Sequence, residues 1–368
     1  MKKLKNKLYY IVAGEASGDL HGAHIMSCII NNVPDIRFRG VGGPLMGARG
    51  LRSLVPFGRL AVIGFFEAFK DLLFFIKIKK QIVRDVLSVQ PEKIILIDYP
   101  GFNLLLAKEI KKTINIPIIF YISPQVWAWK EGRISIIKNC VDKLIVVFPF
   151  EKPWYKKRNI DVQYFGHPSI DLYKKSVLLK KSLSSPVIGL FPGSRKQEIA
   201  KHVPLFVKIV KLILKTNPQM QFVVGLAPGI DPHKIKKLTQ LNNVIIKNND
   251  SLKIFNESSV AIVASGTAAL ECAITKTPFV VIYKTSFLSW VLVKCFLSVS
   301  YASMVNILAK KPIIKEFLQY QTSPSKIADY TITLLEGPDQ TIKNLSSVVD
   351  TLGSGQAYEQ AAQYIVNY

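Results

Sequence analysis

Two carboxylates stand where short apolar runs end in the first half of the chain. Asp98 closes the run 94–97, and Glu15 follows the run 9–13 in the stretch Gly-Glu-Ala-Ser-Gly-Asp, which also contains Ser17. Burial raises the pKa of a carboxyl group, so an aspartate at the end of a buried strand could act as a general base. Asp98 could equally cap the helix expected after it, and the local sequence leaves both interpretations open.

The turn that contains Glu15 and Ser17 lies between an expected strand and an expected helix. Such a turn offers free backbone N–H groups and the positive end of a helix to an anion or a sugar. The glycine spacing is not Gly-x-Gly-x-x-Gly, and no acidic residue ends a second strand at the expected distance, which disfavours a dinucleotide site. The alternative is a tight structural turn in which Ser17 is the N-cap.

Two further small-residue turns occur in the second half of the chain, and both could hold phosphate. The first contains Gly193, Ser194 and Arg195, whose guanidinium could bind phosphate oxygens bidentately. The second contains Ser265, Gly266 and Thr267, and Glu271 follows one helical turn later, where it could accept both hydroxyls of a ribose. Because each turn ends a predicted strand of one sheet, the pair indicates a site for a nucleoside diphosphate.

No metal ion or other cofactor is expected. The chain has no Asp-x-Asp pair, so the charge of a leaving diphosphate must be met by Arg195 and helix dipoles. His21 and His24 lie three residues apart without further ligands in view, and a surface or packing role is favoured for them. Trp127 and Trp129 could line a sugar or acyl site or pack in the core.

A strongly apolar segment covers residues 60–77 and turns basic at its end. This pattern is typical of an element that dips into a lipid surface, and it would also suit an acyl-chain groove or a helix buried under the sheet. The residues expected to contact lipid or acyl chains are Val62, Ile63, Phe65, Phe66, Phe69, Leu72 and Leu73.

The elements that must position these residues alternate between short β-branched runs and longer helical patterns. The runs are 9–13, 94–98, 118–121 and 144–148 in the first half, and 187–190, 222–225, 244–246, 260–264 and 279–283 in the second. Runs that are apolar on both faces predict parallel sheets covered by helices on both sides. The rhythm restarts after the Lys- and Ser-rich segment 173–185, which we interpret as a linker. The prediction is an α/β protein of two Rossmann-like, doubly wound domains facing a cleft.

Composition narrows the possible classes further. The chain has 368 residues, and Lys+Arg 49 against Asp+Glu 25 gives a formal net charge of +24. Basic residues are spread along the whole chain, and no nucleic-acid-binding motif accompanies them. The charge could consist of solvated lysines on helix faces, or it could attract an anionic membrane, which we expect as a partner rather than nucleic acid. Four scattered cysteines without a Cys-x-x-Cys pair fit a reducing compartment, and neither an export signal nor a membrane-spanning helix is evident.

Eight motifs in order resemble the lipid-A-disaccharide synthase family. They are AGEASGD at 13–19, GFFEA at 64–68, IDYPGFN at 97–103, SPQVWAW at 123–129, PFEK at 149–152, FGHP at 165–168, PGSR at 192–195 and ASGTAALE at 264–271. The resemblance implies the GT-B fold, with an acceptor- and membrane-facing domain over 1–172, a UDP-sugar domain over 186–344, and a last helix at about 345–368 that returns to the first domain.

The resemblance also implies the reaction and the site. Such an enzyme joins UDP-2,3-diacylglucosamine to 2,3-diacylglucosamine 1-phosphate (lipid X), inverts the anomeric centre and releases UDP. Asp98 matches the general base, Glu15 and Ser17 match the N-terminal active-site motif, and the 62–76 segment matches the membrane-docking patch. The residues that fall where the family binds UDP are Arg195, Ser265, Thr267, Glu271 and Asn306. Gly101 departs from the family's pattern, in which the resemblance implies a second acid at this position.

The implied location is the cytoplasm, on the cytoplasmic face of the inner membrane, with a homodimer possible. Two other classes stay open. Another GT-B enzyme, such as a UDP-N-acetylglucosamine epimerase, would share the second-domain turns but would not need the apolar segment. A non-enzymatic basic membrane-binding protein would release no UDP, and the paired phosphate turns argue against it.

Overall fold

The computed structural model of the chain describes residues 7–56, 72–128, 131–173, 186–227, 230–248, 251–285 and 299–368. The chain forms two compact units, Met1–Pro168 with Ser354–Tyr368, and Ser169–Gly353. From the sequence, the first domain is expected to end at residue 172 and the chain to return to it at about residue 345. In the structure the chain returns to the first unit only at Ser354, because the helix over 339–350 packs within the second unit.

The first unit is built on a sheet of seven parallel strands in the order β3-β2-β1-β4-β5-β6-β7. The strands are β1 Leu8–Ala13, β2 Arg37–Val41, β3 Leu51–Ser53, β4 Lys93–Ile97, β5 Ile118–Tyr121, β6 Lys143–Val146 and β7 Gln163–Tyr164. The helices are α1 Ala16–Asn32, α2 Pro44–Gly47, α4 Leu72–Val89, α5 Pro100–Thr113, η2 Glu131–Arg133, α6 Ile134–Cys140, α7 Glu151–Lys156 and α17 Ala357–Asn367. Helix α8, Pro168–Tyr173, contains the boundary between the units.

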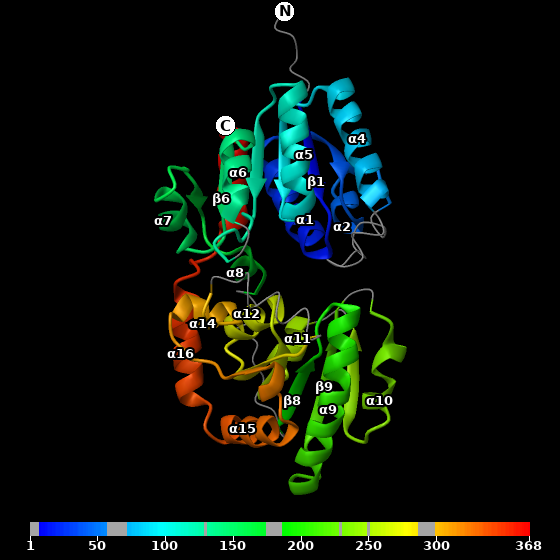
Figure 1. Cartoon of the computed structure of the whole chain (residues 1–368), viewed down its shortest axis with the longest axis vertical. Coiled ribbons are helices and arrows are strands. Elements are labelled where there is room, and N and C mark those ends of the chain that lie inside the picture. Colours follow the sequence, from blue (N-terminus) through cyan, green and yellow to red (C-terminus); the bar gives the residue numbers. More distant parts are fainter. Residues whose placement is uncertain are drawn as a thin grey trace, which may run out of the picture. The chain divides into compact units, whose positions relative to one another are not determined.

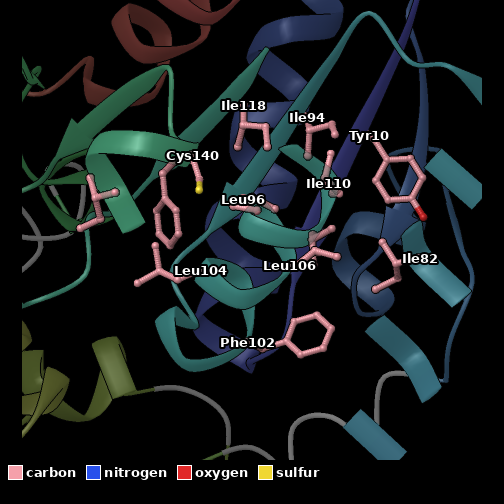
Figure 2. Packing of buried hydrophobic residues seen from close by; sticks show 14 of the residues in the cluster. Tyr10, Ile82, Ile94, Leu96, Phe102, Leu104, Leu106, Ile110, Ile118 and Cys140 are labelled. Atoms are coloured by element: carbon pink, nitrogen blue, oxygen red, sulfur yellow. The ribbon is translucent and has the colours of Figure 1, made fainter. Parts of the chain in front are cut away.

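Helices cover both faces of this sheet because its central strands are apolar on both sides. Helix α5 packs between α4 and α6 on one face (Figure 1). Side chains of these helices meet alternate residues of the strands in one buried cluster, in which Leu106 and Ile110 of α5 face Ile94 and Leu96 of β4 (Figure 2). Helix α17 brings the end of the chain back to pack against α1.

The second unit repeats this plan with six parallel strands in the order β10-β9-β8-β11-β12-β13. The strands are β8 Val187–Phe191, β9 Gln221–Leu226, β10 Val244–Asn248, β11 Val260–Ala264, β12 Phe279–Tyr283 and β13 Glu316–Leu318. The helices are α9 Lys196–Thr216, η4 Pro232–Ile235, α10 Lys236–Thr239, α11 Ser251–Asn256, α12 Thr267–Ile274, α14 Met304–Ala309, η5 Gln319–Gln321, α15 Pro324–Glu336 and α16 Asp339–Asp350. Its core joins α9 and α15 to the strands.

Strand order decides which turns become neighbours. In each sheet the direction of winding reverses beside the first strand, between β1 and β4 and between β8 and β11. Ligands of doubly wound sheets bind beyond the carboxyl ends of the strands at this switch point. The four turns that the sequence marked as chemical follow these four strands. The two parallel sheets and their flanking helices confirm the predicted α/β fold class.

Candidate active site

Asp98 lies at a sharp backbone corner directly after β4. Ala13 pairs with Ile97 in the parallel register, so Gly14 and Asp98 leave the sheet side by side. Asp98 has φ 45° and Tyr99 has φ 50°, so two consecutive non-glycine residues adopt the left-handed conformation. The N-cap of α5 is Tyr99, whose side chain makes no capping hydrogen bond. Asp98 thus precedes the N-cap position and accepts the backbone N–H of Tyr99.

The environment of Asp98 suits a base that works near neutral pH. Burial and the nearby charge of Glu15 raise the pKa of its carboxyl group to about 7, although the backbone N–H of Tyr99 donates to the carboxylate and acts in the opposite direction. Among the described residues, no lysine or arginine forms a salt bridge with Asp98. A carboxyl group with this pKa can take up a proton at physiological pH.

The Gly-Glu-Ala-Ser-Gly-Asp stretch divides into an exposed part and a structural part. Glu15 and Ser17 are exposed at the start of α1, and Glu15 is the N-cap of this helix. Asp19 is buried, and its carboxylate accepts the backbone N–H groups of residues 43, 45 and 46 at 2.9–3.0 Å, which caps α2. Gly14 must be glycine because a Cβ there would overlap the Tyr99 ring. The structure therefore brings Glu15 and Asp98 together at one end of the sheet.

Glu151 is a buried acid that sequence reasoning missed as an individual residue. Its carboxylate accepts the indole N–H of Trp127 at 3.0 Å and the backbone N–H groups of Val147 and Phe148 at 3.1 and 2.9 Å. Burial raises its pKa to about 7 despite these bonds. Trp127 is buried and its ring meets Phe150 edge-on, so it packs in the core, while Trp129 lies outside the described residues. The only available signal for Glu151 was the PFEK motif.

The two histidines of α1 pack against the returning end of the chain. The Nδ1 atom of His21 lies 2.7 Å from the hydroxyl of Tyr358, and the ring of His24 stacks on the Tyr358 ring. Burial lowers the pKa of His21 to about 4, so this imidazole is neutral at physiological pH. The structure gives both residues the packing role that was favoured for them.

The turn after β8 binds a carboxylate of the same chain, that of Glu198. The Glu198 carboxylate accepts the backbone N–H groups of Ser194 and Arg195 at 3.2 and 3.3 Å, and its other oxygen lies 3.0 Å from Nη1 of Arg195. Gly193 has φ 104°, and a Cβ there would overlap this carboxylate. The Arg195 side chain is nevertheless 72% exposed. The two backbone N–H groups of this proposed phosphate turn therefore donate to Glu198. The Arg195 guanidinium also contacts Glu198, but most of its side chain is accessible to solvent.

The turn after β11 has an exposed rim. Gly266 and Thr267 are exposed, and Gly266 has φ 151° and ψ −154°, a conformation that L side chains rarely adopt. The Ser265 hydroxyl donates to the carbonyl oxygen of Ala302 at 2.7 Å. This hydroxyl therefore links the turn to the loop before α14, and the rim that can meet a ligand is formed by residues 266 and 267.

Glu271 is hydrogen-bonded by two hydroxyls, which belong to Tyr173 and Ser251. Burial raises the pKa of its carboxyl group. The sequence assigned this carboxylate to two ribose hydroxyls. In the structure the Glu271 carboxylate instead accepts hydrogen bonds from two hydroxyls of the protein.

Asn306 needs a correction. It is fully buried, and its amide bonds the backbone N–H and carbonyl of Ile314 at 2.9 and 2.8 Å and the carboxylate of Glu316 at 2.7 Å. Glu316 also accepts the backbone N–H groups of Ala302 and Ser303 at 2.9 Å. Direct contact with a nucleotide does not fit these bonds, which hold the loop that Ser265 contacts. Glu316 was missed because its partners are close only in the folded chain.

The expected lipid-contacting segment lies mostly outside the described residues. This holds for Val62, Ile63, Phe65, Phe66 and Phe69, and for the linker residues 174–185. Helix α4 begins at Leu72, and Leu73 is 82% exposed. Among the described residues no helix is long and apolar enough to cross a bilayer.

Comparison with solved structures shows the fold. UDP-N-acetylglucosamine 2-epimerase from Neisseria meningitidis, bound to UDP-N-acetylglucosamine, matches with a TM-score of 0.62 at 12% identity and covers 98% of both chains. MurG from Acinetobacter baumannii matches with a TM-score of 0.56 at 11% identity, over 98% of this chain and 100% of that chain. These likenesses are to GT-B proteins, so the chain has the GT-B fold.

Comparison of sequences shows the family. The model of the family described as lipid-A-disaccharide synthetase matches residues 9–366. Lipid-A-disaccharide synthase 1 of Legionella pneumophila is 38% identical over 359 residues and 94% of each chain. Lipid-A-disaccharide synthase of Syntrophus aciditrophicus is 34% identical over 372 residues, covering 98% of this chain and 97% of the relative. Since the family model matches nearly the whole chain and these relatives are 34–38% identical at high coverage, the chain belongs to the lipid-A-disaccharide synthase family.

Proposed function

We propose that this glycosyltransferase of lipid A synthesis uses Asp98 as the base that activates its acceptor. The enzyme condenses UDP-2,3-diacylglucosamine with 2,3-diacylglucosamine 1-phosphate to form the β-1,6-linked disaccharide 1-phosphate and UDP. Asp98 takes the proton from the acceptor 6-hydroxyl, which attacks the anomeric carbon from the face opposite the departing UDP. A single displacement inverts the configuration. The observation that carries this role is a strand-end carboxyl group whose pKa is about 7.

The second unit is proposed to bind the nucleotide of the donor. The exposed guanidinium of Arg195 meets the diphosphate, and the rim formed by Gly266 and Thr267 at the N-terminus of α12 adds backbone donors. These groups stabilise the negative charge that develops on UDP as the glycosidic bond breaks. Glu271 accepts the ribose hydroxyls in place of Tyr173 and Ser251.

Helix α4 supports docking on an anionic bilayer. Exposed residues at helical spacing change from apolar to basic along its length, through Leu73, Ile76, Lys77, Lys80 and Arg84. The neighbouring α5 adds the exposed Lys108 and Lys112, whereas α1 and α17 contain no lysine or arginine. A ridge of this kind can insert its apolar end below the headgroups while the ammonium groups meet lipid phosphates.

A UDP-release assay tests the substrate assignment. The enzyme is given the diacylated donor with lipid X, and in parallel water-soluble UDP-N-acetylglucosamine with the same acceptor. We expect UDP release that depends on both diacylated substrates. Epimerisation of UDP-N-acetylglucosamine without an acceptor would instead support the epimerase alternative and contradict the proposal.

Vesicle co-sedimentation tests the docking surface. We expect the protein to bind phosphatidylglycerol-containing vesicles, and Leu73→Ser to weaken this binding several-fold by removing an exposed leucine from the ridge. Leu212→Ser is the matched control, since Leu212 is also a solvent-exposed leucine but lies on α9 of the second unit. Equal binding by Leu73→Ser and the wild type would contradict a role for the α4 ridge.

A further inference from the structure

Asn103 is a fully buried asparagine in the first turn and a half of α5. Its Nδ2 donates to the carbonyl oxygens of Ile97 at 3.2 Å and Asp98 at 2.8 Å. Within the described part of the chain, its Oδ1 has no hydrogen-bond partner. An unsatisfied buried acceptor is unfavourable, and an apolar side chain of similar size would avoid that cost. Packing alone therefore does not explain an asparagine at this position.

The two carbonyl groups converge on one amide because the backbone turns left-handed. In an extended strand, successive carbonyls point to opposite sides, and a single side chain cannot bond both. Here Asp98 and Tyr99 both have positive φ, a conformation that is strained for residues other than glycine. The backbone N–H groups of Phe102 and Asn103 bond the carbonyl oxygen of Tyr99 at 3.2 and 3.0 Å. The start of α5 thus satisfies three successive carbonyls of the corner.

The strand side of the corner is also anchored. The backbone N–H of Asp98 donates to the carbonyl oxygen of Tyr121 at the end of β5, at 3.0 Å. The Tyr99 ring lies against Gly14 at the end of β1, where a Cβ would overlap it. With β5 on one side and β1 on the other, the Asn103 amide bonds the carbonyls of the corner itself, between β4 and α5.

We infer that Asn103 is a positioning residue for Asp98, holding the left-handed corner that directs the Asp98 carboxylate toward the acceptor. The inference rests on the proposed role of Asp98 as the base. Asn103 does not touch the reacting atoms. It acts through the backbone of residues 97 and 98, and its loss lets the corner relax toward ordinary backbone conformations and the carboxylate turn toward solvent.

The charged surroundings of Asp98 are simple enough for a pH profile to report this change. From the β1–α1 turn, Glu15 raises the pKa of Asp98, and from the corner itself the Tyr99 backbone N–H lowers it. Strand β5 contributes Tyr121, and residues 100–107 of α5 contain no charged side chain. Burial is the largest cause of the raised pKa. Exposure of the carboxylate therefore moves the pKa down, toward its ordinary value.

The experiment measures kcat against pH for the wild type, Asn103→Leu and Asn103→Ser. Leucine keeps the branching at Cγ and removes both N–H donors, whereas serine retains one hydroxyl donor. We expect kcat to fall at least tenfold in Asn103→Leu, and the acid limb of the profile, near pH 7 in the wild type, to move to lower pH. Asn103→Ser should show the same changes to a smaller extent. If the leucine variant fails to fold, the serine variant decides.

Leu106→Ala is the matched control. Leu106 is fully buried in the same helix and has no hydrogen bond to the corner, so its truncation should lower the melting temperature and leave the acid limb in place. Acid limbs of the Asn103 variants at the wild-type pH would overturn the inference. Near-normal turnover of Asp98→Asn would instead overturn the base assignment itself, which separates the two failures.

Discussion

The two units share one sheet plan and treat the charged groups at their switch points in opposite ways. In the first unit, Asp98 has no salt bridge among the described residues, and the nearby Glu15 makes its ionisation harder. In the second unit, Arg195 faces Glu198, and Glu271 receives two protein hydroxyls. The first switch point holds a carboxyl group whose ionisation is disfavoured by burial and by a like charge. The second holds an arginine and carboxylates that already have hydrogen-bond partners within the chain.

The difference follows from what each site must do. A general base must hold its proton loosely near the working pH, which requires burial without a cation. A nucleotide site must keep its turns folded when no ligand is bound, and buried donors and carboxylates stay ordered only with partners. In the function proposed above, a diphosphate would replace Glu198, and a ribose would replace Tyr173 and Ser251, as partners of these groups.

The largest effect is expected at the base. Asp98→Asn keeps the side-chain volume and removes the proton acceptor, so kcat should fall by about 10²–10⁴-fold, the usual contribution of general-base catalysis. The affinity for UDP, measured by titration calorimetry, should stay within about twofold of the wild type because the groups proposed to bind the nucleotide lie in the second unit. Near-normal turnover of Asp98→Asn would show that Asp98 is not the general base, and the proposed difference between the two switch points would then fail.

The same substitution should stabilise the fold at alkaline pH. The folded-state pKa of about 7 lies above the ordinary 3.8, so the native protein retains a proton that the unfolded chain has lost. Its stability therefore falls as pH rises from about 4 through 7. Asparagine does not ionise, so the free energy of unfolding of Asp98→Asn should exceed that of the wild type at pH 8, by at most about 4 kcal/mol. Urea unfolding at pH 4 and pH 8 measures this difference in stability, and a gain that does not grow with pH would contradict the raised pKa of Asp98.

A smaller loss of stability is expected in the second unit. Glu316→Ala leaves the backbone donors of Ala302 and Ser303 and the Asn306 amide without their carboxylate, which should cost about 3 kcal/mol. Glu336→Ala, at an exposed glutamate of α15, is the control and should change the urea midpoint little. Equal midpoints for the two variants would show that Glu316 does not hold the loop before α14.

A tenfold effect is expected on donor binding. Arg195→Ala removes the exposed guanidinium and should raise KM for the diacylated donor about tenfold with a smaller change in kcat, since an exposed charged hydrogen bond contributes about 1.4 kcal/mol. Arg195→Lys should recover part of the loss because it keeps the charge without the bidentate geometry. An unchanged KM in both variants would exclude Arg195 from the nucleotide site.

The smallest effect sharpens the contrast in the first unit. Glu15→Gln removes the charge that raises the pKa of Asp98 and leaves burial in place. The acid limb of the kcat profile should therefore move slightly to lower pH, and the limb should not disappear. A limb that stays in place would mean that Glu15 does not act on Asp98 through its charge.

Much of the fold could be predicted from apolar runs. Strands β5, β11 and β12 have the bounds of the predicted runs, because each is buried and apolar on both faces. The strands that were missed are short or polar. Strand β2 carries Arg39, whose guanidinium bonds Asp85 of α4, and β13 carries Glu316. A charged residue in a strand is accommodated by a partner far away in the chain, which no local pattern reveals.

The sequence by itself determined the chemistry that is available: a carboxylate ending a buried run, two small-residue turns opening helices, and an order of motifs specific enough to indicate the family. Only the tertiary structure decided which of these groups remain available for substrates. Asp19, Glu198 and Asn306 are bonded within the chain, whereas Asp98 lies at a strained corner and forms no salt bridge with any residue that the structure describes. The physical reason is that side-chain type is local, while burial and hydrogen-bond partners depend on strand order and on contacts between distant segments.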